Sequence, residues 1–264
     1  MSDLICKDLC MTFTNPQTGA AVEELKDINF SLKQGELLSV LGPSGCGKTT
    51  LLNMIAGFIN PTSGHLELGG NRIESPGVER GMVFQQGALF EWLPVARNVD
   101  FGLRMKKMNV KESEALVEKW LNIVGLAGFG DTPTYQLSGG MQQRVALARC
   151  LVNDPDLILM DEPLGALDAL TREKMQSLIL ELWKETGKTI IITHSVEEAL
   201  LLGERLFVMA PRPGRIYKEY NLPFAEQGLK KSLREIKQQK DFGKVREEIL
   251  TMIWDMEEEI MGNV

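Results

Sequence analysis

The stretch from Leu37 to Thr50, LLSVLGPSGCGKTT, constrains the fold of this chain more than any other feature. Its first five residues are a short apolar run of the kind that forms a buried strand, and the residues that follow it are typical of a helix start. Between them, the spacing Gly42-x-x-x-x-Gly47-Lys48-Thr49 lets the backbone curl so that successive N–H groups point inward. The stretch therefore predicts a strand, a phosphate-binding loop (P-loop) and a helix in succession.

The residue types in this loop predict a binding site for a nucleoside triphosphate and Mg²⁺. We expect the Lys48 ammonium to reach the β- and γ-phosphates and the Thr49 hydroxyl to take one Mg²⁺ coordination position. A glycine-rich turn that carries Lys-Thr by chance is the alternative, and the flanking strand and helix patterns favour the nucleotide. The residues expected to contact the nucleotide here are Gly42, Pro43, Ser44, Gly45, Cys46, Gly47, Lys48, Thr49 and Thr50.

Composition restricts the class of protein. With 264 residues, 44% of them hydrophobic, the chain is long enough for one large core with a smaller satellite. No run approaches about 18 apolar residues and the N-terminus lacks a secretory pattern, so we expect neither a membrane span nor signal-peptide export. The net charge of -7 disfavours nucleic acid as a partner. The 4 cysteines lack metal-site spacing, which indicates reduced thiols of a cytosolic protein.

Further apolar runs end in polar residues that suit the chemistry of a phosphate site. Gln85 follows the run at 81–84, Asp161 and Glu162 follow the run at 157–160, and His194 ends the run at 189–193. We expect Asp161 to hold the Mg²⁺ shell, Glu162 to act as general base, and Gln85 to bind Mg²⁺ or position water. Singly, Gln85 also fits a loop start and His194 a structural histidine.

A second candidate anion site lies at Ser138, Gly139 and Gly140, which precede a helical run. Ser138 is a good N-cap, and the two glycines leave backbone N–H groups open to a ligand. Phe13, at the end of the first predicted strand, is either a platform for an adenine ring or a core aromatic. From residue 87 onward, aromatic and amphipathic patterns predict a helical insertion into the core.

The order of these motifs resembles that of an ATP-binding-cassette (ABC) ATPase. GPSGCGKTT, a strand-end glutamine, a helical insertion, LSGGMQQR, LILMDEP, ALD and TH follow one another over about residues 3–216, and LSGG with DEP is specific to that family. The resemblance implies an α/β fold, that of a P-loop NTPase of ABC type with a RecA-like core, an N-terminal antiparallel β subdomain and an inserted helical subdomain.

The resemblance implies an ATPase domain at residues 1–220 and a C-terminal helical extension at 221–264. Within the ATPase domain, residues 1–86 and 150–220 would form the core with the β subdomain, and 87–149 the helical subdomain with the signature helix. We expect the extension to be a solvated pair of amphipathic helices that cap the domain.

Specific roles also follow from the resemblance. Gln85 corresponds to the Q-loop glutamine, Ser138 to Gln142 to the signature, Asp168 to the D-loop aspartate, His194 to the switch histidine and Phe13 to the aromatic residue that stacks on adenine. The implied catalytic residues are Glu162, His194, Gln85 and Lys48. The implied Mg²⁺ ligands are Thr49, Gln85 and Asp161, and further nucleotide contacts are Phe13, Ser138, Gly139, Gly140 and Gln142.

Two positions depart from the family pattern. Met141 stands where glutamine is commoner, and Ser195 stands where aspartate is usual. Neither departure removes a backbone N–H donor or the imidazole, so we expect activity to be retained.

Longer stretches, among them ERGMVFQQGALFEWLPVARNVDFGL and LWKETGKTIIITH, resemble the ATPases of nitrate, aliphatic sulfonate and taurine importers, most of all taurine importers. The resemblance implies ATP hydrolysis that drives import of a small anionic or zwitterionic solute. Implied partners are an integral membrane permease, contacted through the Q-loop and helical subdomain, and indirectly a periplasmic or lipid-anchored binding protein. The chain would lie peripherally on the cytoplasmic face of the inner membrane. The alternative is a soluble ABC ATPase that acts on nucleic acid, ribosomes or cluster assembly.

The chain has two candidate anion-binding helix starts, at 45–49 and 138–140, and one set of catalytic carboxylates. Both could reach the same nucleotide within one copy only if the insertion folded back over its own P-loop. In the family, two copies pair head to tail, and the signature of one closes on the nucleotide of the other. We therefore expect a head-to-tail homodimer with ATP at its interface.

Overall fold

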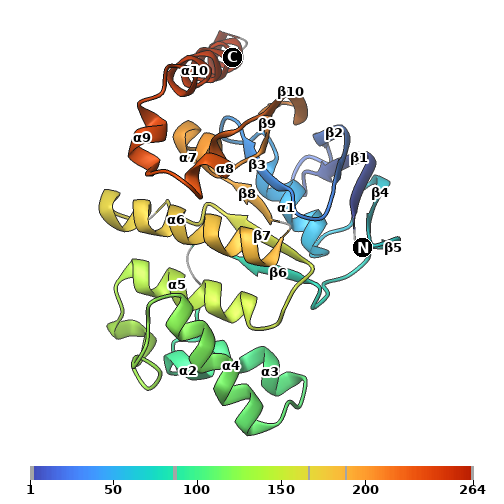
Figure 1. Cartoon of the computed structure of the whole chain (residues 1–264). Helices are drawn as coiled ribbons and strands as arrows, with labels where there is room; N and C mark the ends of the chain where they lie inside the picture. Colours follow the sequence, from blue (N-terminus) through green and yellow to red (C-terminus); the bar gives the residue numbers. More distant parts are fainter. Residues whose placement is uncertain (1–2, 86–87, 166, 188, 263–264) are drawn as a thin grey trace.

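A largely parallel six-stranded sheet forms the centre of the structure (Figure 1). The computed structural model describes residues 3–85, 88–165, 167–187 and 189–262. Among these residues the strands follow the order β10-β9-β3-β8-β7-β6. Their bounds are β3 (Leu37–Leu41), β6 (Arg80–Val83), β7 (Leu157–Asp161), β8 (Thr189–Ile192), β9 (Arg205–Ala210) and β10 (Arg215–Asn221).

The parallel strands are buried because their sequences are apolar on both faces. β3 and β8 are buried at every position, and β7 is buried at all but its last residue. β3 lies between β8 and β9, with Val40 opposite Ile192 and Phe207. β7 lies between β6 and β8, with Asp161 opposite Ile192. The carboxyl ends of these strands therefore meet at one edge of the sheet, where ligands of open α/β sheets bind.

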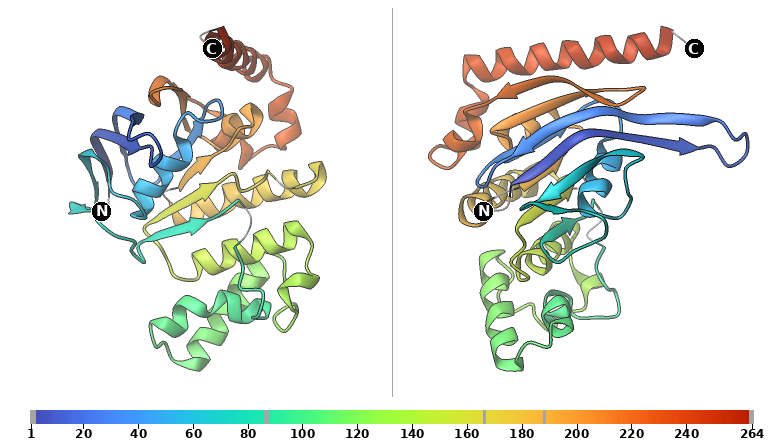
Figure 2. Two further views of the ribbon diagram at one scale, coloured as in Figure 1. Left: turned by 180° about the vertical axis from the view of Figure 1, so that it is seen from behind. Right: turned by 90° about the vertical axis from the view of Figure 1, so that its right-hand side faces the viewer.

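An antiparallel sheet packs beside the central one. It consists of β2 (Ala21–Leu32), β1 (Leu4–Thr14), β4 (Ser63–Leu68) and β5 (Asn71–Arg72), in that spatial order. Its buried side chains share one apolar cluster with those of α1 (Lys48–Ala56). In Figure 2 the β1–β2 hairpin projects beyond the rest of this sheet.

Helices cover the central sheet and continue below it in Figure 1. The covering helices include α5 (Gly139–Leu151), α6 (Ala169–Thr186) and α7 (Val196–Leu201). Below them lie α2 (Val95–Val99), α3 (Phe101–Met105), α4 (Val110–Ile123) and the short η1 (Thr134–Gln136). Side chains of α2 to α5 form an apolar cluster of their own. This cluster corresponds to the helical insertion that the sequence predicts.

The C-terminal segment packs on the main core as three helices, whereas the sequence predicts a pair of amphipathic helices that cap the domain. It forms α8 (Phe224–Gly228), α9 (Leu233–Lys237) and α10 (Lys240–Gly262). Phe224 and Phe242 are buried and meet edge to face with ring centroids 5.0 Å apart, and Ile249 joins the same cluster. The apolar stripe of α10 at helical spacing is that of an amphipathic helix. Among the described residues, none of the helices combines the length and apolar character that crossing a membrane requires.

Candidate nucleotide-binding and catalytic site

The loop between β3 and α1 adopts the conformation that its glycines were expected to permit. Gly45 has φ 74° and Gly47 has φ 86°, both in the left-handed region that favours glycine. Gly47 directly precedes α1, and a Cβ on it would lie 2.4 Å from Cδ2 of Leu25. The turn into α1 therefore depends on glycine at this position for both backbone conformation and space.

Lys48 is buried, with 5% of its surface exposed, although it carries a charge. Its Nζ donates to the carbonyl oxygens of Gly42 at 2.8 Å and Pro43 at 3.0 Å, and lies 3.6 Å from Sγ of Cys46. Neutral carbonyls only partly compensate a buried ammonium, so phosphate oxygens, which are charged acceptors, would bind it more strongly.

A hollow forms in front of this loop, and we name it the P-loop hollow. It brings together residues from four separate parts of the chain: Glu24, residues 44–50, Glu162 and His194. Ser44 and Thr49 are exposed to solvent in it, and Thr50 is half-buried. The structure thus places the predicted general base and the predicted switch histidine beside the predicted phosphate loop.

The Glu162 carboxylate is held from both sides. Its Oε1 is in close contact with Nε2 of His194, and its Oε2 accepts a hydrogen bond from Nε2 of Gln85 at 2.8 Å. The Glu162 backbone has φ 46°, and its N–H donates to the Ile192 carbonyl at 2.8 Å. A left-handed conformation is costly for a residue other than glycine, and such strain clusters at functional sites. Three of the four predicted catalytic side chains therefore meet directly.

Asp161 ends β7 beside this group. The pKa of the Asp161 carboxyl is raised, first by burial and then by the neighbouring Glu162 carboxylate. His194 and Lys48 offset part of this rise. A cation near Asp161 would relieve both raising effects. Each of the predicted Mg²⁺ ligands, Thr49, Gln85 and Asp161, has a side-chain oxygen, the ligand atom that Mg²⁺ prefers. Among the described residues no group of three or more His, Cys, Asp or Glu side chains forms a metal site by itself, so phosphate oxygens or water would complete the coordination.

Two of the predicted signature residues, Gly139 and Gln142, line a different hollow. Ser138 caps α5, its Oγ accepting from the Met141 N–H at 3.3 Å. Gly139 and Gln142 line a second hollow together with Gln85, and neither lines the P-loop hollow as described. A Cβ on the buried Gly140 would lie 2.5 Å from Cγ2 of Thr171. Glycine at 140 thus lets α5 approach α6, a packing reason that the sequence did not indicate.

Two other predicted residues lie apart from the P-loop hollow. Phe13 is 43% exposed in β1, opposite Val22 in the projecting hairpin, and the described lining of the hollow does not include it. Asp168 caps α6 and accepts hydrogen bonds from the N–H groups of Leu170 and Thr171, each at 3.1 Å. Hydrogen bonding to Thr171, first through its side chain and then through its N–H, lowers the pKa of Asp168.

Glu24 and Gly214 belong to this region but were not predicted. Oε1 of Glu24 lies in the P-loop hollow, 3.5 Å from the Thr50 hydroxyl that donates to it. The Gly214 N–H donates to the Glu24 carbonyl at 2.8 Å, and a Cβ on Gly214 would lie 2.3 Å from the Cys46 carbonyl oxygen. The motif PRPG at 211–214 indicates a turn, and nothing in the sequence indicates its contact with the phosphate loop.

Curated proteins resemble this chain over nearly its whole length. The taurine import ATP-binding protein TauB of Pelagibacter ubique is 76% identical over 99% of this chain and 99% of its own length. The protein of the same name from a Jannaschia species is 65% identical over 99% of this chain and 98% of its own length.

Solved structures share the fold. A dimeric bacterial ABC transporter cassette is 33% identical, with a TM-score of 0.74, over 83% of this chain and 98% of its own. The structure of cbiO1 from Clostridium perfringens, part of an ABC transporter complex, is 30% identical, with a TM-score of 0.74, over 93% of this chain and 98% of its own. These likenesses confirm the predicted α/β fold of ABC type. The family profile described as ABC transporter matches residues 25–165, and the chain belongs to this family of ABC transporter ATP-binding proteins.

Proposed function

We propose that this chain is the ATP-hydrolysing subunit of an ABC importer for taurine, with aliphatic sulfonates and nitrate as related solutes. The observation that carries ATP hydrolysis is the Glu162 carboxylate, held between His194 and Gln85 beside the phosphate loop. The solute follows from relatives that are named for taurine import, one of them 76% identical.

Residues of the P-loop hollow share the proposed reaction with Asp161 and Gln85, which lie outside its described lining. The N–H groups of residues 44–50 and the Lys48 ammonium bind the β- and γ-phosphates. Glu162 accepts a proton from the water that attacks the γ-phosphorus, and His194 orients Glu162 and contacts the γ-phosphate. Bound Mg²⁺ would neutralise phosphate charge, held by Thr49, Asp161 and Gln85.

A head-to-tail homodimer would complete the site. Ser138 and Gly139 are exposed at the start of α5, with backbone N–H groups suited to a phosphate, yet they do not line the P-loop hollow of their own chain as described. A solved relative, 33% identical, forms a dimer. In the proposed dimer these N–H groups reach the γ-phosphate bound by the other copy, and Phe13 stacks on the adenine.

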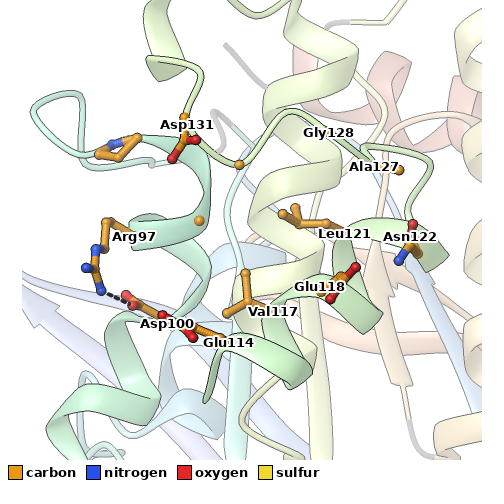
Figure 3. Close-up of a pocket in the computed structure, with 13 residues that line it drawn as sticks. Arg97, Asp100, Glu114, Val117, Glu118, Leu121, Asn122, Ala127, Gly128 and Asp131 are labelled. Carbon is orange, nitrogen blue, oxygen red and sulfur yellow. Dashed lines mark hydrogen bonds and ion pairs between the residues drawn. The ribbon is translucent and has the colours of Figure 1, made fainter. Parts of the chain in front are cut away.

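The permease would bind the helical subdomain, for which we propose residues 87–149, between core segments 1–86 and 150–220. Trp92 is 79% exposed, and its loop is braced by the buried Asn98, which exchanges hydrogen bonds of 2.8 and 3.0 Å with the Phe90 backbone. A hollow next to this loop (Figure 3) is lined by α2, α4 and residues 127–131. Arg97 lines it too and pairs with Asp100 at 2.8 Å. The remaining carboxylates, Glu114, Glu118 and Asp131, favour a basic permease segment.

With such a permease, the chain lies peripherally on the cytoplasmic face of the inner membrane, and a solute-binding protein acts on it only through the permease. The extension at 221–264 packs on the core as part of the same subunit. Nucleic acid stays a disfavoured partner, because the net charge is -7.

The proposal is tested by reconstituting this chain with its permease and binding protein in liposomes. Uptake of taurine, short alkanesulfonates and nitrate is measured alongside ATP hydrolysis. We expect ATP-dependent uptake with taurine preferred, and loss of both activities in Lys48→Ala. Trp92→Ala should keep the ATPase activity of the isolated chain and reduce uptake by the complex. ATP hydrolysis without uptake of any of these solutes would contradict the import function.

A further inference from the structure

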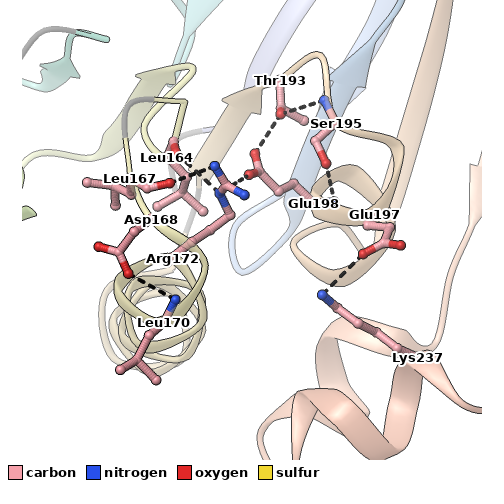
Figure 4. A network of polar contacts seen from close by, with 10 residues as sticks. All are labelled: Leu164, Leu167, Asp168, Leu170, Arg172, Thr193, Ser195, Glu197, Glu198 and Lys237. Carbon is pink, nitrogen blue, oxygen red and sulfur yellow. Dashed lines mark hydrogen bonds and ion pairs between the residues drawn. The ribbon is translucent and has the colours of Figure 1, made fainter.

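Beyond the ends of β7 and β8, two charged side chains join the loops that carry Glu162 and His194. They are Arg172 of α6 and Glu198 of α7 (Figure 4). Glu162 follows β7 on the way to α6, and His194 lies between β8 and α7. Neither charged residue is in the described lining of the P-loop hollow. Any effect of this pair on catalysis would therefore act through the two loops.

The Arg172 side chain binds backbone carbonyl groups of the loop that follows Glu162. Its Nη2 donates to the Leu167 carbonyl oxygen at 2.7 Å, and its Nε donates to that of Leu164 at 3.4 Å. The same Nε lies 3.4 Å from Oε1 of Glu198. A planar guanidinium with five N–H donors can serve two carbonyls and a carboxylate at once, which an ammonium cannot do in one geometry.

Glu198 holds the second loop. It is 6% exposed, and its Oε2 accepts a hydrogen bond from the Thr193 hydroxyl at 2.7 Å. The Thr193 hydroxyl oxygen accepts in turn from the Ser195 N–H at 3.0 Å. The residues on both sides of His194 are therefore fixed by one partly buried network. Satisfied networks of this kind, in a medium of low dielectric constant, are rigid.

We propose that Arg172 and Glu198 are positioning residues for ATP hydrolysis, which together fix the loop after Glu162 and the loop of His194 relative to each other. The inference rests on the proposed hydrolytic function. Glu162 and His194 are in contact and have to face one γ-phosphate. A displacement of about 1 Å in a reacting geometry can lower turnover by about 100-fold, so a link between the two loops controls the rate without touching ATP.

The adjacent residue provides a matched control. Glu197 lies on the same short helix but points to the C-terminal extension, where its carboxylate pairs with Lys237 at 3.2 Å and Arg246 at 3.1 Å (Figure 4 draws the Lys237 pair). Among the described residues, the Glu197 side chain forms no hydrogen bond or ion pair with either catalytic loop. Replacing glutamate with glutamine at 197 and, separately, at 198 therefore separates a general effect on α7 from the loss of the network.

The test compares Glu198→Gln, Arg172→Lys and the double variant with Glu197→Gln, using the isolated full chain and MgATP. We expect the first three to lower kcat by about 10- to 100-fold while the KM for ATP stays within about threefold. The double variant should lose no more kcat than the less active of the two single variants, because both residues act through one link. Glu197→Gln should match the natural chain.

A second pair of variants keeps the test valid if Glu198→Gln fails to fold. Thr193→Val removes the hydroxyl at constant shape and should lower kcat. Thr193→Ser keeps the hydroxyl and should have the kcat of the natural chain. Unchanged kcat in Arg172→Lys and Thr193→Val, or an equal loss in Glu197→Gln, would overturn the inference. In either case hydrolysis by the natural chain would leave the proposed function intact; absence of hydrolysis by the natural chain would contradict the proposed function itself.

Discussion

Replacing Gly214 with alanine tests whether the turn at residues 211–214 braces the phosphate loop. A Cβ on Gly214 would lie 2.3 Å from the carbonyl oxygen of Cys46, 3.0 Å from that of Glu24 and 2.8 Å from Cδ2 of Leu25. Two of these three neighbours are backbone atoms of segments that are packed on other elements. Relief of the overlap therefore requires the turn to move away from the loop by about 1 Å.

That movement weakens two short hydrogen bonds. The Gly214 N–H donates to the Glu24 carbonyl at 2.8 Å, and the Lys26 N–H donates to the Gly214 carbonyl at 2.9 Å. Overpacking of this kind costs about 1–3 kcal/mol, and two weakened hydrogen bonds add about 1 kcal/mol. We expect the free energy of unfolding to fall by about 2–4 kcal/mol and the thermal midpoint by roughly 5–10 °C.

Thermal unfolding, with and without a non-hydrolysable ATP analogue, measures both effects. Gly243→Ala is the control, because a Cβ on Gly243 in α10 would meet no atom within 4 Å. Alanine in a helix interior should stabilise the protein by up to about 1 kcal/mol. Gly214→Ala should lower the midpoint and reduce the shift caused by nucleotide, and Gly243→Ala should raise the midpoint and leave that shift unchanged. A midpoint for Gly214→Ala equal to that of the natural chain would refute the reasoning.

Further predictions concern the extension, the phosphate loop and the buried thiols. Phe242→Ala should lower the free energy of unfolding by about 3–5 kcal/mol in denaturant titrations, because the ring is buried against Phe224; a loss below about 1 kcal/mol would mean that α10 is not part of the core. Lys48→Met should weaken ATP binding about 10- to 100-fold by calorimetry, since charge-assisted hydrogen bonds are lost; equal affinity would exclude the assigned phosphate contact. Burial raises the pKa of Cys6 and of Cys150 from 9.0 to about 12. As the pH rises, these thiols ionise in the unfolded chain before they ionise in the folded one. Their contribution to the free energy of unfolding is therefore complete below pH 9 and is lost as the pH rises toward 12. The fall in unfolding free energy over this pH range should be shallower in Cys150→Ala, and an identical slope would count against the assignment.

The phosphate loop could be predicted because its chemistry is local. Glycine spacing, the strand before it and the helix after it lie within one short stretch, and the structure has β3, the loop and α1 in that order. The side chains at the strand ends were predicted one by one, and their meeting follows from the parallel order of β6, β7 and β8. Sequence periodicity does not give this order.

Contacts between distant segments could not be predicted from the sequence. The pairing of Arg172 with Glu198 depends on how α6 and α7 pack, and the approach of Gly214 to Cys46 depends on the adjacent sheets. The sequence predicts amphipathic helices that cap the domain, but not which side chains reach the core. In the structure Phe242 and Ile249 occupy the apolar stripe of α10 and enter the main core, a packing decided by tertiary context.

The central claim is that Glu162 removes a proton from the water that attacks ATP bound at the phosphate loop. Glu162→Gln keeps the shape of the side chain and its contact with Gln85 while it removes the base. Hydrolysis and ATP-dependent association of the purified chain are measured together, by phosphate release and by light scattering. We predict that kcat falls by at least about 100-fold and that dimers accumulate with MgATP. Turnover equal to that of the natural chain would contradict the claim.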